Sequence, residues 1–273
     1  MPMDDVKFLQ EKARIIRKNI IEMIWVSKSG HPGGSLSLAD IMSVLYFKDL
    51  TYDVKIPKWS GRDRVILSKG HAAPVWYATL AEVGFFPREE LNKLRQMDAL
   101  LEGHPCIHIP GVDATTGSLG LGLSIACGMA LAAKMKSLNN IRIYAIIGDG
   151  ELGEGQIWEA AMAAAHFKLD NITAILDRNL YQNDGATKDI LNLESYSEKW
   201  KSFGWNTIEI DGHDIREIIS ALDNGRNFKG KPTMIVANTV KGKGVSYLID
   251  RPDLHYTQPT DEQKESAFKD LGF

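Results

Sequence analysis

An aspartate and an asparagine follow two apolar segments of the sequence at a spacing that suits a metal ion. Asp149 lies in a Gly-Asp-Gly turn directly after the apolar run at 143–147, and Asn179 follows a second apolar run at 172–177. The pattern predicts two strands joined by a helix, with an oxygen ligand at the end of each strand. Hard oxygen ligands at the ends of neighbouring parallel strands suit Mg²⁺, and Gly150 lets a backbone come close to a phosphate.

Three Gly-His pairs in predicted loops indicate further chemistry. His31, His71 and His104 each follow a glycine, and the first and third are followed by proline. An imidazole can hydrogen-bond sugar hydroxyls or a diphosphate, and it can transfer protons near neutral pH. A single loop histidine is usually a surface residue, so the repetition favours a functional interpretation. We interpret His213 as an ordinary turn residue, and His108 has no identifiable partner.

A glycine-rich segment and three glutamates can be interpreted from the residues around them. The segment 116–122 lacks the lysine of a P-loop, so we expect it to let a flat ring approach the backbone. Glu151 and Glu154 begin the next helix, where acidic residues compensate the helix dipole. Glu159 lies further along, among alanines that allow close helix packing. It is therefore a candidate for an acidic network at a subunit contact.

Strands that alternate with helices predict an α/β fold with a doubly wound parallel sheet, in one domain over 1–273. The expected strands are 65–67, 142–147, 172–177, 206–210 and 233–238. The expected helices are 5–28, 37–48, 73–83, 87–96, 120–137, 155–167, 194–203 and 214–223. An extended C-terminal arm is expected from about residue 241 to 273. Ligands of such sheets gather beyond the carboxyl ends of the strands, so the polar residues there should form one site.

Composition narrows the class of protein. The chain has 273 residues, of which 44% are hydrophobic and 25% charged, so a packed core is expected. A net charge of −3 gives no reason to expect nucleic acid, and the apolar runs are too short for a membrane span. The polar residues 1–5 are unlike a secretory leader. Cys106 and Cys127 are too few for a disulfide framework and are expected to be small buried thiols, so we expect a cytoplasmic protein.

Seven motifs together resemble the N-terminal, pyrophosphate-binding half of transketolase, an enzyme that uses thiamine diphosphate (ThDP) and Mg²⁺. The resemblance spans about residues 10–260. In chain order the motifs are Ser29-Gly30-His31-Pro32-Gly33, Ser68-Lys69-Gly70-His71, Glu102-Gly103-His104-Pro105, Gly117-Ser118-Leu119-Gly120, Gly148-Asp149-Gly150 with Asn179, Asp184-Gly185-Ala186-Thr187, and Thr239-Val240-Lys241-Gly242-Lys243-Gly244. The resemblance implies a ThDP-binding fold and the transfer of a two-carbon ketol unit from a ketose donor to an aldose acceptor.

The resemblance also implies a role for each matching residue. The ligands of Mg²⁺ would be Asp149, Asn179 and the backbone carbonyl of Tyr181. The groups that touch the diphosphate would be His71, His255 and the Gly150 amide. The residues that line the thiazolium ring would be Gly117, Leu119 and Val240. The donor ketose would face His31 and His104, with His71 and His255 close by for proton transfer. The acidic network at the subunit interface would include Glu154 and Glu159.

Two positions depart from the family pattern. The family usually has His-Gly in the C-terminal arm, whereas this sequence has Leu254-His255-Tyr256. The family also tends to place an aliphatic residue where this chain has Asn183, which could change cofactor contacts or substrate choice.

The chain stops where the pyrimidine-binding domain of transketolase would begin, so it resembles the N-terminal chain of a split transketolase. The resemblance then implies a C-terminal partner subunit that supplies the glutamate needed to activate the cofactor. Two copies of each chain would assemble, and this chain alone would be inactive. Three alternatives stay open: a deoxyxylulose-phosphate-synthase-like subunit, a dehydrogenase E1-like subunit, and a non-catalytic ThDP-binding regulatory subunit. The sugar, an ordinary pentose phosphate or a sulfo- or branched sugar, also stays open.

Overall fold

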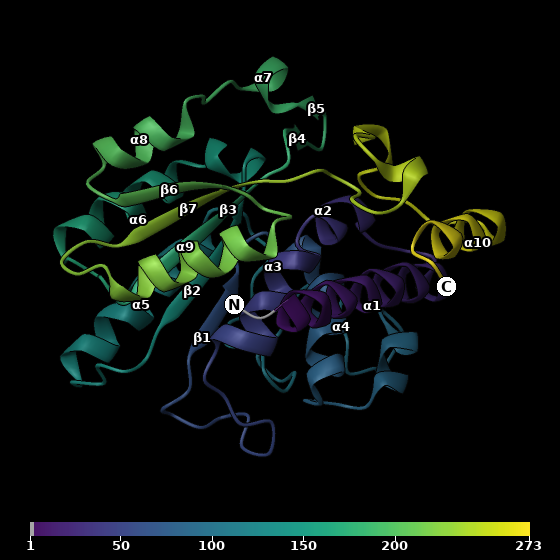
Figure 1. The fold of residues 1–273 in the computed structure, drawn as a ribbon, viewed down its shortest axis with the longest axis horizontal. Coiled ribbons are helices and arrows are strands. Elements are labelled where there is room, and N and C mark those ends of the chain that lie inside the picture. Colours follow the sequence, from purple (N-terminus) through teal and green to yellow (C-terminus); the bar gives the residue numbers. More distant parts are fainter. Residues whose placement is uncertain (1–2) are drawn as a thin grey trace.

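Five parallel strands form the central sheet of the computed structural model, which describes residues 3–273 (Figure 1). Their order across the sheet is β1 (Arg64–Leu67), β2 (Ile143–Gly148), β3 (Ile172–Arg178), β7 (Thr233–Asn238) and β6 (Asn206–Asp211). All four pairings are parallel. Residues 1 and 2 lie outside the described residues. They belong to the polar segment 1–5, which was expected to differ from a secretory leader.

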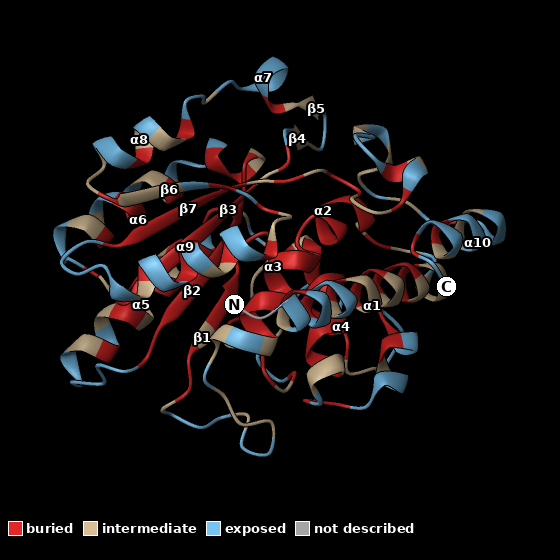
Figure 2. Ribbon diagram, viewed as in Figure 1, coloured by how far each residue is buried: buried red, intermediate tan, exposed pale blue. Residues whose placement is uncertain are grey.

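Helices cover both faces of this sheet, and each face has its own apolar core. One core joins alternate strand residues such as Tyr144 and Ile146 to α1 (Met3–Ser27), α3 (Ala39–Val44), α4 (Ala73–Val83) and α9 (Ile215–Asn227). The other core joins the intervening residues, such as Ala145 and Ile147, to α5 (Leu121–Met135), α6 (Gly155–His166) and α8 (Tyr196–Ser202). The inner strands β2, β3 and β7 are buried on both faces and largely apolar. Figure 2 shows them buried between helices whose outer surfaces are exposed, whereas β6 at the edge is partly exposed. The doubly wound parallel sheet predicted from the sequence is confirmed.

The segment after β7 differs from the extended arm that was expected. It contains the 3₁₀ turns Ser246–Leu248 and Pro252–Leu254 and then α10 (Asp261–Asp270), which lies beside α1 (Figure 1). Thr260 and Gln263 form a reciprocal capping box at the start of α10. The segment therefore folds back over the carboxyl side of the sheet.

Two of the expected helices also differ. The region 37–48 is divided between α3 and a π-helical turn, Leu45–Asp49, and is preceded by a separate short helix, α2 (Pro32–Leu36). The region 87–96 contains only the 3₁₀ turn Arg88–Lys93. Two further elements were not expected from the sequence: the hairpin of β4 (Tyr181–Gln182) and β5 (Gly185–Ala186), and the short helix α7 (Thr187–Ile190) that follows it. The 3₁₀ turns Gly70–Ala72 and Gly150–Gly153 follow β1 and β2. Across residues 3–273, the structure contains no helix with the length and apolar character needed to cross a bilayer.

Candidate active site

The carboxyl ends of β1, β2 and β3 open onto one cavity of about 490 Å³. The predicted site residues that line it are His31, His71, His104, Gly117, Leu119, Asp149, Gly150, Glu154, Asn179, Tyr181 and His255. Asn183, one of the departures from the family pattern, also lines it. Val240 and Glu159 are not among the lining residues. The cavity thus gathers groups that are up to 224 residues apart in the sequence, from His31 to His255.

Asp149 and Asn179 lie at the ends of neighbouring strands, as the sequence predicts. The Asp149 carboxylate accepts hydrogen bonds from the backbone amides of Gly150 (2.8 Å) and Leu180 (2.6 Å). Asn179 is also buried and donates its amide nitrogen to Asp177 (3.0 Å). Its Oδ1 atom accepts the Tyr181 amide (3.2 Å) and keeps a second lone pair for a ligand. A buried carboxylate beside a carboxamide oxygen is a donor set that Mg²⁺ prefers.

Burial strongly disfavours the ionised form of Asp149. Burial, and then the negative charge of Asp177, raise the pKa of Asp149 to about 7. A divalent cation would remove this penalty by compensating the buried charge. The residues at the ends of β2 and β3 therefore fit a metal ion.

A buried ion pair links the end of β3 to the segment that follows β1. Lys69 pairs with Asp177 at the end of β3, and both side chains are almost fully buried. Asp177 also accepts hydrogen bonds from the hydroxyls of Ser37 (2.7 Å) and Thr239. Burial opposes its ionisation, but Lys69 and these donors hold the pKa of Asp177 below its usual value. The pair was not expected from the sequence, where its only signal was a charged residue inside a buried apolar run.

Three histidines form a tight group in the lining of the cavity. The ring centroids of His31, His71 and His255 are 5.1 to 5.3 Å apart. Burial, and then nearby cationic side chains, lower the pKa of His31 to about 4 and that of His255 to about 3, and they lower the pKa of His71 still further. The imidazoles are therefore neutral at physiological pH, so each offers one donor and one acceptor. The Nδ1 atom of His31 is buried without a partner, which leaves it free for a ligand.

His104 approaches from a separate loop and is more exposed than the other three. Its backbone carbonyl accepts a hydrogen bond from the Tyr77 hydroxyl (2.8 Å). Gly117 has a φ of +154°, and a Cβ there would lie 3.1 Å from the His104 ring, so a glycine is needed where this loop meets the ring. Burial, and then the guanidinium of Arg95, lower the pKa of His104.

Lys241 is a second buried cation, to which the sequence analysis gave no role beyond its motif. The residue is 1% exposed, and its Nζ atom lies 3.0 Å from Nδ1 of His255. Burial, and then the charge of Lys69, lower the pKa of Lys241 to about 8. A Cβ at Gly34 would lie 3.4 Å from Nζ of Lys69 and 3.9 Å from Nε2 of His71. This part of the cavity is thus a glycine-lined, cationic cradle that suits a diphosphate.

His213, interpreted from the sequence as a turn residue, holds the backbone of Val240. Its Nε2 atom accepts the Val240 backbone N–H (2.9 Å), so Nδ1 carries the proton and donates to Asp40 (2.7 Å). Asp40 is in turn paired with Arg17. Because these residues come from four separate segments, no local sequence pattern could have identified the arrangement.

The glutamates divide between a buried role and an exposed one. Glu151 is buried, contrary to the expected role at a helix N-terminus, and accepts hydrogen bonds from Ser68 Oγ (2.5 Å) and the Gly120 amide (2.8 Å). It therefore fastens the glycine-rich loop to the end of β1. Glu154 and Glu159 are both exposed.

Comparisons with known proteins agree with the geometry. The family described as "Transketolase, thiamine diphosphate binding domain" matches residues 9–273. The chain is 46% identical to the 6-deoxy-6-sulfo-D-fructose transketolase subunit SqwG of Clostridium sp. (strain MSTE9), over 96% of each chain. It is 40% identical to one of the subunits of apulose-4-phosphate transketolase from Phocaeicola vulgatus, over 97% of this chain and 94% of that one.

Single-chain transketolases share the same fold over part of their length. The crystal structure of transketolase from Campylobacter jejuni superposes with a TM-score of 0.92 at 35% identity, over 98% of this chain and 43% of that chain. Human transketolase is 41% identical over 90% of this chain and 39% of its own length. The chain thus spans about two fifths of these longer relatives.

Proposed function

This chain belongs to the transketolase family, and we propose that it is the half of a two-chain transketolase that holds the Mg-diphosphate end of ThDP. Its cofactors are ThDP and a divalent metal, typically Mg²⁺. It is a subunit of an enzyme that transfers a two-carbon ketol unit from a ketose to an aldose. The observation that carries the assignment of its site is the meeting of Asp149, Asn179 and three neutral histidines in one cavity.

Asp149, the Oδ1 atom of Asn179 and the carbonyl of Tyr181 would hold the metal. The first two are fixed by hydrogen bonds to the backbone and to Asp177, so little ordering is required when the ion binds. The anionic end of the cofactor would lie between this metal and the cationic cradle of Lys69 and Lys241. We propose the whole of residues 1–273 as one such pyrophosphate-binding unit, with 241–273 as its C-terminal segment.

His71, His255 and the Gly150 amide would hydrogen-bond the diphosphate, and Gly117 and Leu119 would face the thiazolium ring. All of these residues line the cavity. Val240 would contribute from behind the lining, where His213 fixes its backbone. When bound, the cofactor supplies an electron sink for the two-carbon fragment of the sugar.

His31 and His104 would bind the hydroxyls of the donor and exchange protons with them. His31 presents an unpaired buried Nδ1 atom, and His104 comes from a loop on the exposed side. Neutral imidazoles can accept a proton from a hydroxyl and return it, and the lowered pKa of each keeps it neutral at physiological pH. His71 and His255 lie close enough to join this exchange.

The substrate is proposed from the printed names of the relatives. The sulfofructose and apulose-4-phosphate enzymes both take a sugar that carries an anionic group. The Arg95 guanidinium lies near both His31 and His104 and lowers the pKa of each, after burial. We propose a ketose donor with a sulfonate or phosphate at its far end, on which Arg95 would act as a counter-charge.

The partner would be a separate C-terminal chain with the pyrimidine-binding domain, in an assembly of two copies of each chain. Relatives of the same span are named as subunits, whereas single-chain transketolases continue well beyond the matched region. Exposed Met162 on α6, beside the exposed carboxylates Glu154 and Glu159, marks a face for that contact. The free thiols of Cys106 and Cys127 suit the reducing cytoplasm, which we propose as the compartment.

Reconstitution tests this function. The purified chain, supplied with Mg²⁺ and ThDP, should not turn over any ketose donor. Addition of a partner chain with the pyrimidine domain, encoded for example by an adjacent reading frame, should restore ketol transfer and give an assembly whose mass by light scattering equals two copies of each chain. Substantial turnover by the pure chain would refute the two-chain proposal, and an inactive mixture that still binds ThDP would favour the alternative of a regulatory subunit.

A further inference from the structure

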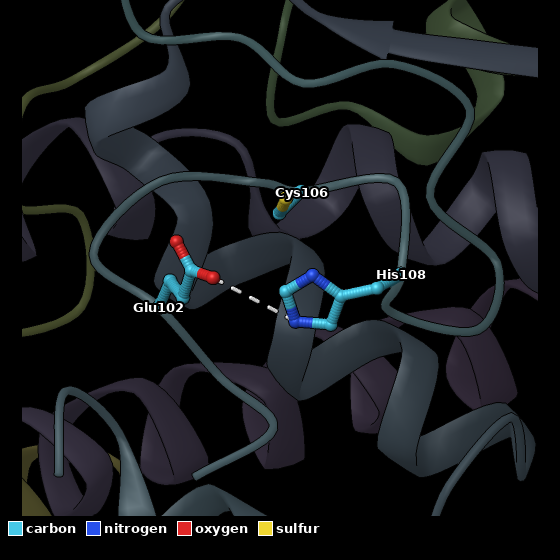
Figure 3. A group of neighbouring side chains, drawn as sticks. All are labelled: Glu102, Cys106 and His108. Atoms are coloured by element: carbon cyan, nitrogen blue, oxygen red, sulfur yellow. Dashed lines mark ion pairs between the residues drawn. The ribbon is translucent and has the colours of Figure 1, made fainter. Parts of the chain in front are cut away.

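Three side chains with different metal-binding groups lie together on the loop that carries His104. Glu102, Cys106 and His108 each offer a ligand atom, and these atoms all lie within 4.8 Å of one another. Figure 3 shows the Glu102 carboxylate facing the His108 ring, with an Oε1–Nε2 distance of 3.7 Å. Within residues 3–273, the lining of the active-site cavity includes His104 but none of these three. The proposed function leaves the cluster without a role.

The backbone between the three side chains is already held in place. The Tyr77 hydroxyl donates to the carbonyl of His104 (2.8 Å), and the Thr116 amide donates to that of Pro105 (3.2 Å). The Ile109 amide donates to the carbonyl of Cys106 (3.0 Å). Because the scaffold is fixed, a ligand that binds here has little backbone to order.

The spacing of the ligand atoms needs only a small adjustment. Ligand atoms of a tetrahedral zinc site lie roughly 3.3–3.8 Å apart, from bond lengths of about 2.0–2.3 Å. The ligand atoms lie within 4.8 Å of one another, which exceeds this spacing by at most about 1.0–1.5 Å. Glu102 and His108 are exposed, so rotation of their side chains can close the difference without moving the core. The Nε2 atom of His108 exchanges its contact with the Leu100 carbonyl (3.2 Å) for the ion.

The mixture of donor atoms selects the class of metal. A thiolate with an imidazole favours a borderline or soft ion over the hard Mg²⁺ of the cofactor site. The Thr115 hydroxyl accepts the Ile107 amide (3.3 Å) and lies 3.5 Å from the Cys106 sulfur, towards which it donates. Such a second hydrogen bond orients a ligand and stabilises the thiolate. Three protein ligands leave a fourth position open to water.

We propose that Glu102, Cys106 and His108 form a binding site for a zinc-class divalent ion. Glu102 and Cys106 flank His104 in the sequence, so the ion ties both sides of the residue that the proposed function places against the donor sugar. Binding adds positive charge beside His104, which the proposed function places against the donor sugar, and so lowers turnover. The binding part of the proposal stands independently of the proposed function, whereas the effect on turnover rests on it.

Cobalt absorption tests the binding. The full chain is titrated with Co²⁺ under reducing conditions and excess Mg²⁺, which keeps the Asp149 site occupied. We expect a thiolate-to-cobalt charge-transfer band that saturates at about one ion per chain and disappears when Zn²⁺ is added. Cys106→Ser should abolish the band, and Thr115→Val should weaken cobalt affinity by roughly tenfold. No band in the wild-type chain, or a band that survives Cys106→Ser, overturns the site.

Cys127 gives the matched control. It is buried and donates to the Ala160 carbonyl (3.7 Å), and burial raises the pKa of its thiol to about 12. Cys127→Ser should therefore keep the cobalt band, as should Asp149→Ala, which separates this site from the cofactor metal. Thermal melts of each variant show whether it has folded, and His108→Ala provides a second ligand deletion if Cys106→Ser does not fold.

The effect on turnover is measured with the reconstituted enzyme at saturating ThDP. Zn²⁺ should lower kcat of the wild type severalfold and leave kcat of Cys106→Ser unchanged. Equal inhibition of both enzymes would overturn the link to the His104 loop. If the two reconstituted chains prove inactive without zinc, the cobalt band still shows whether the metal site exists. Failure of the proposed function is therefore distinguishable from failure of this inference.

Discussion

Replacement of Asp149 by asparagine should stabilise the metal-free chain at neutral pH and remove its response to Mg²⁺. Asp149 is 3% exposed, and its carboxyl group lies near Asp177. Its ionisation without a metal is therefore costly, because neither water nor a cation compensates the charge. An asparagine has the same shape and no charge, so it avoids this cost.

The size and sign of the effect follow from the pKa of Asp149. Burial raises it from 3.8 to about 7, which corresponds to about 4 kcal/mol. The pKa of Asp149 is higher in the folded chain than in the unfolded one. The protonated carboxyl group therefore contributes its full stability below pH 3.8, and this stability is lost as the pH rises through 7. Asparagine places an amide against one of two backbone N–H donors, at a cost of about 1–3 kcal/mol. The net stabilisation at pH 8 is therefore about 2 kcal/mol.

Urea denaturation of the full chain in EDTA, at pH 5 and pH 8, measures this difference. The difference in unfolding free energy between Asp149→Asn and the wild type should shift in favour of the variant from pH 5 to pH 8. Asp189→Asn, at an exposed position on α7, is the matched control and should follow the wild type. In the reconstituted enzyme, Asp149→Asn should lose most ThDP affinity by calorimetry with Mg²⁺. The reasoning is refuted if the variant is no more stable than the wild type at pH 8 and still binds ThDP normally.

Further substitutions separate the roles of other residues. His31→Ala and His104→Ala should each lower kcat/KM for the donor by roughly 5- to 150-fold, which is about 1–3 kcal/mol, and should leave ThDP affinity unchanged in calorimetry; loss of ThDP binding would mark them as cofactor ligands. His213→Ala removes the acceptor of a backbone N–H at the thiazolium loop, and should weaken ThDP binding by roughly tenfold, with partial recovery in His213→Gln; wild-type affinity would show that the contact does not position the loop. Lys69→Met leaves Asp177 buried and unpaired, and should cost about 3–5 kcal/mol in urea denaturation; a loss below about 1 kcal/mol would contradict the ion pair.

The inner strands β2, β3 and β7 could be predicted from the sequence because parallel strands buried on both faces are nearly continuous apolar runs. The edge strand β6 is partly exposed and mixes polar with apolar residues. Each expected strand lies within one residue of an observed one at either end. The helix expected at 37–48 failed because apolar spacing alone does not show where a helix changes its hydrogen-bond pattern, as it does at Leu45–Asp49. The arm was expected to be extended because the capping box of Thr260 and Gln263 was overlooked, although it was legible in the sequence.

Residues of the site could be predicted where a polar side chain directly follows a predicted strand. Asp149 and Asn179 meet because neighbouring parallel strands end at the same edge, which is a local rule applied twice. His255 could be placed only by resemblance, since it reaches the cavity through the folding back of the C-terminal segment and a contact of the Thr257 amide with the Gly30 carbonyl (3.0 Å). His213 contacts Asp40 across 173 residues, and nothing in the sequence between them indicates that contact.

The charges of the cavity explain why metal and diphosphate should bind together. Asp177 is compensated by Lys69. Without ligands, Asp149 is a buried acid that resists ionisation, and Lys241 is a buried cation whose Nζ contacts a neutral His255. Mg²⁺ compensates the aspartate but adds positive charge near Lys241, whereas the diphosphate compensates Lys241 but adds negative charge near Asp149. Only the pair satisfies both groups, so each ligand should raise the affinity of the other, as thermodynamic linkage requires.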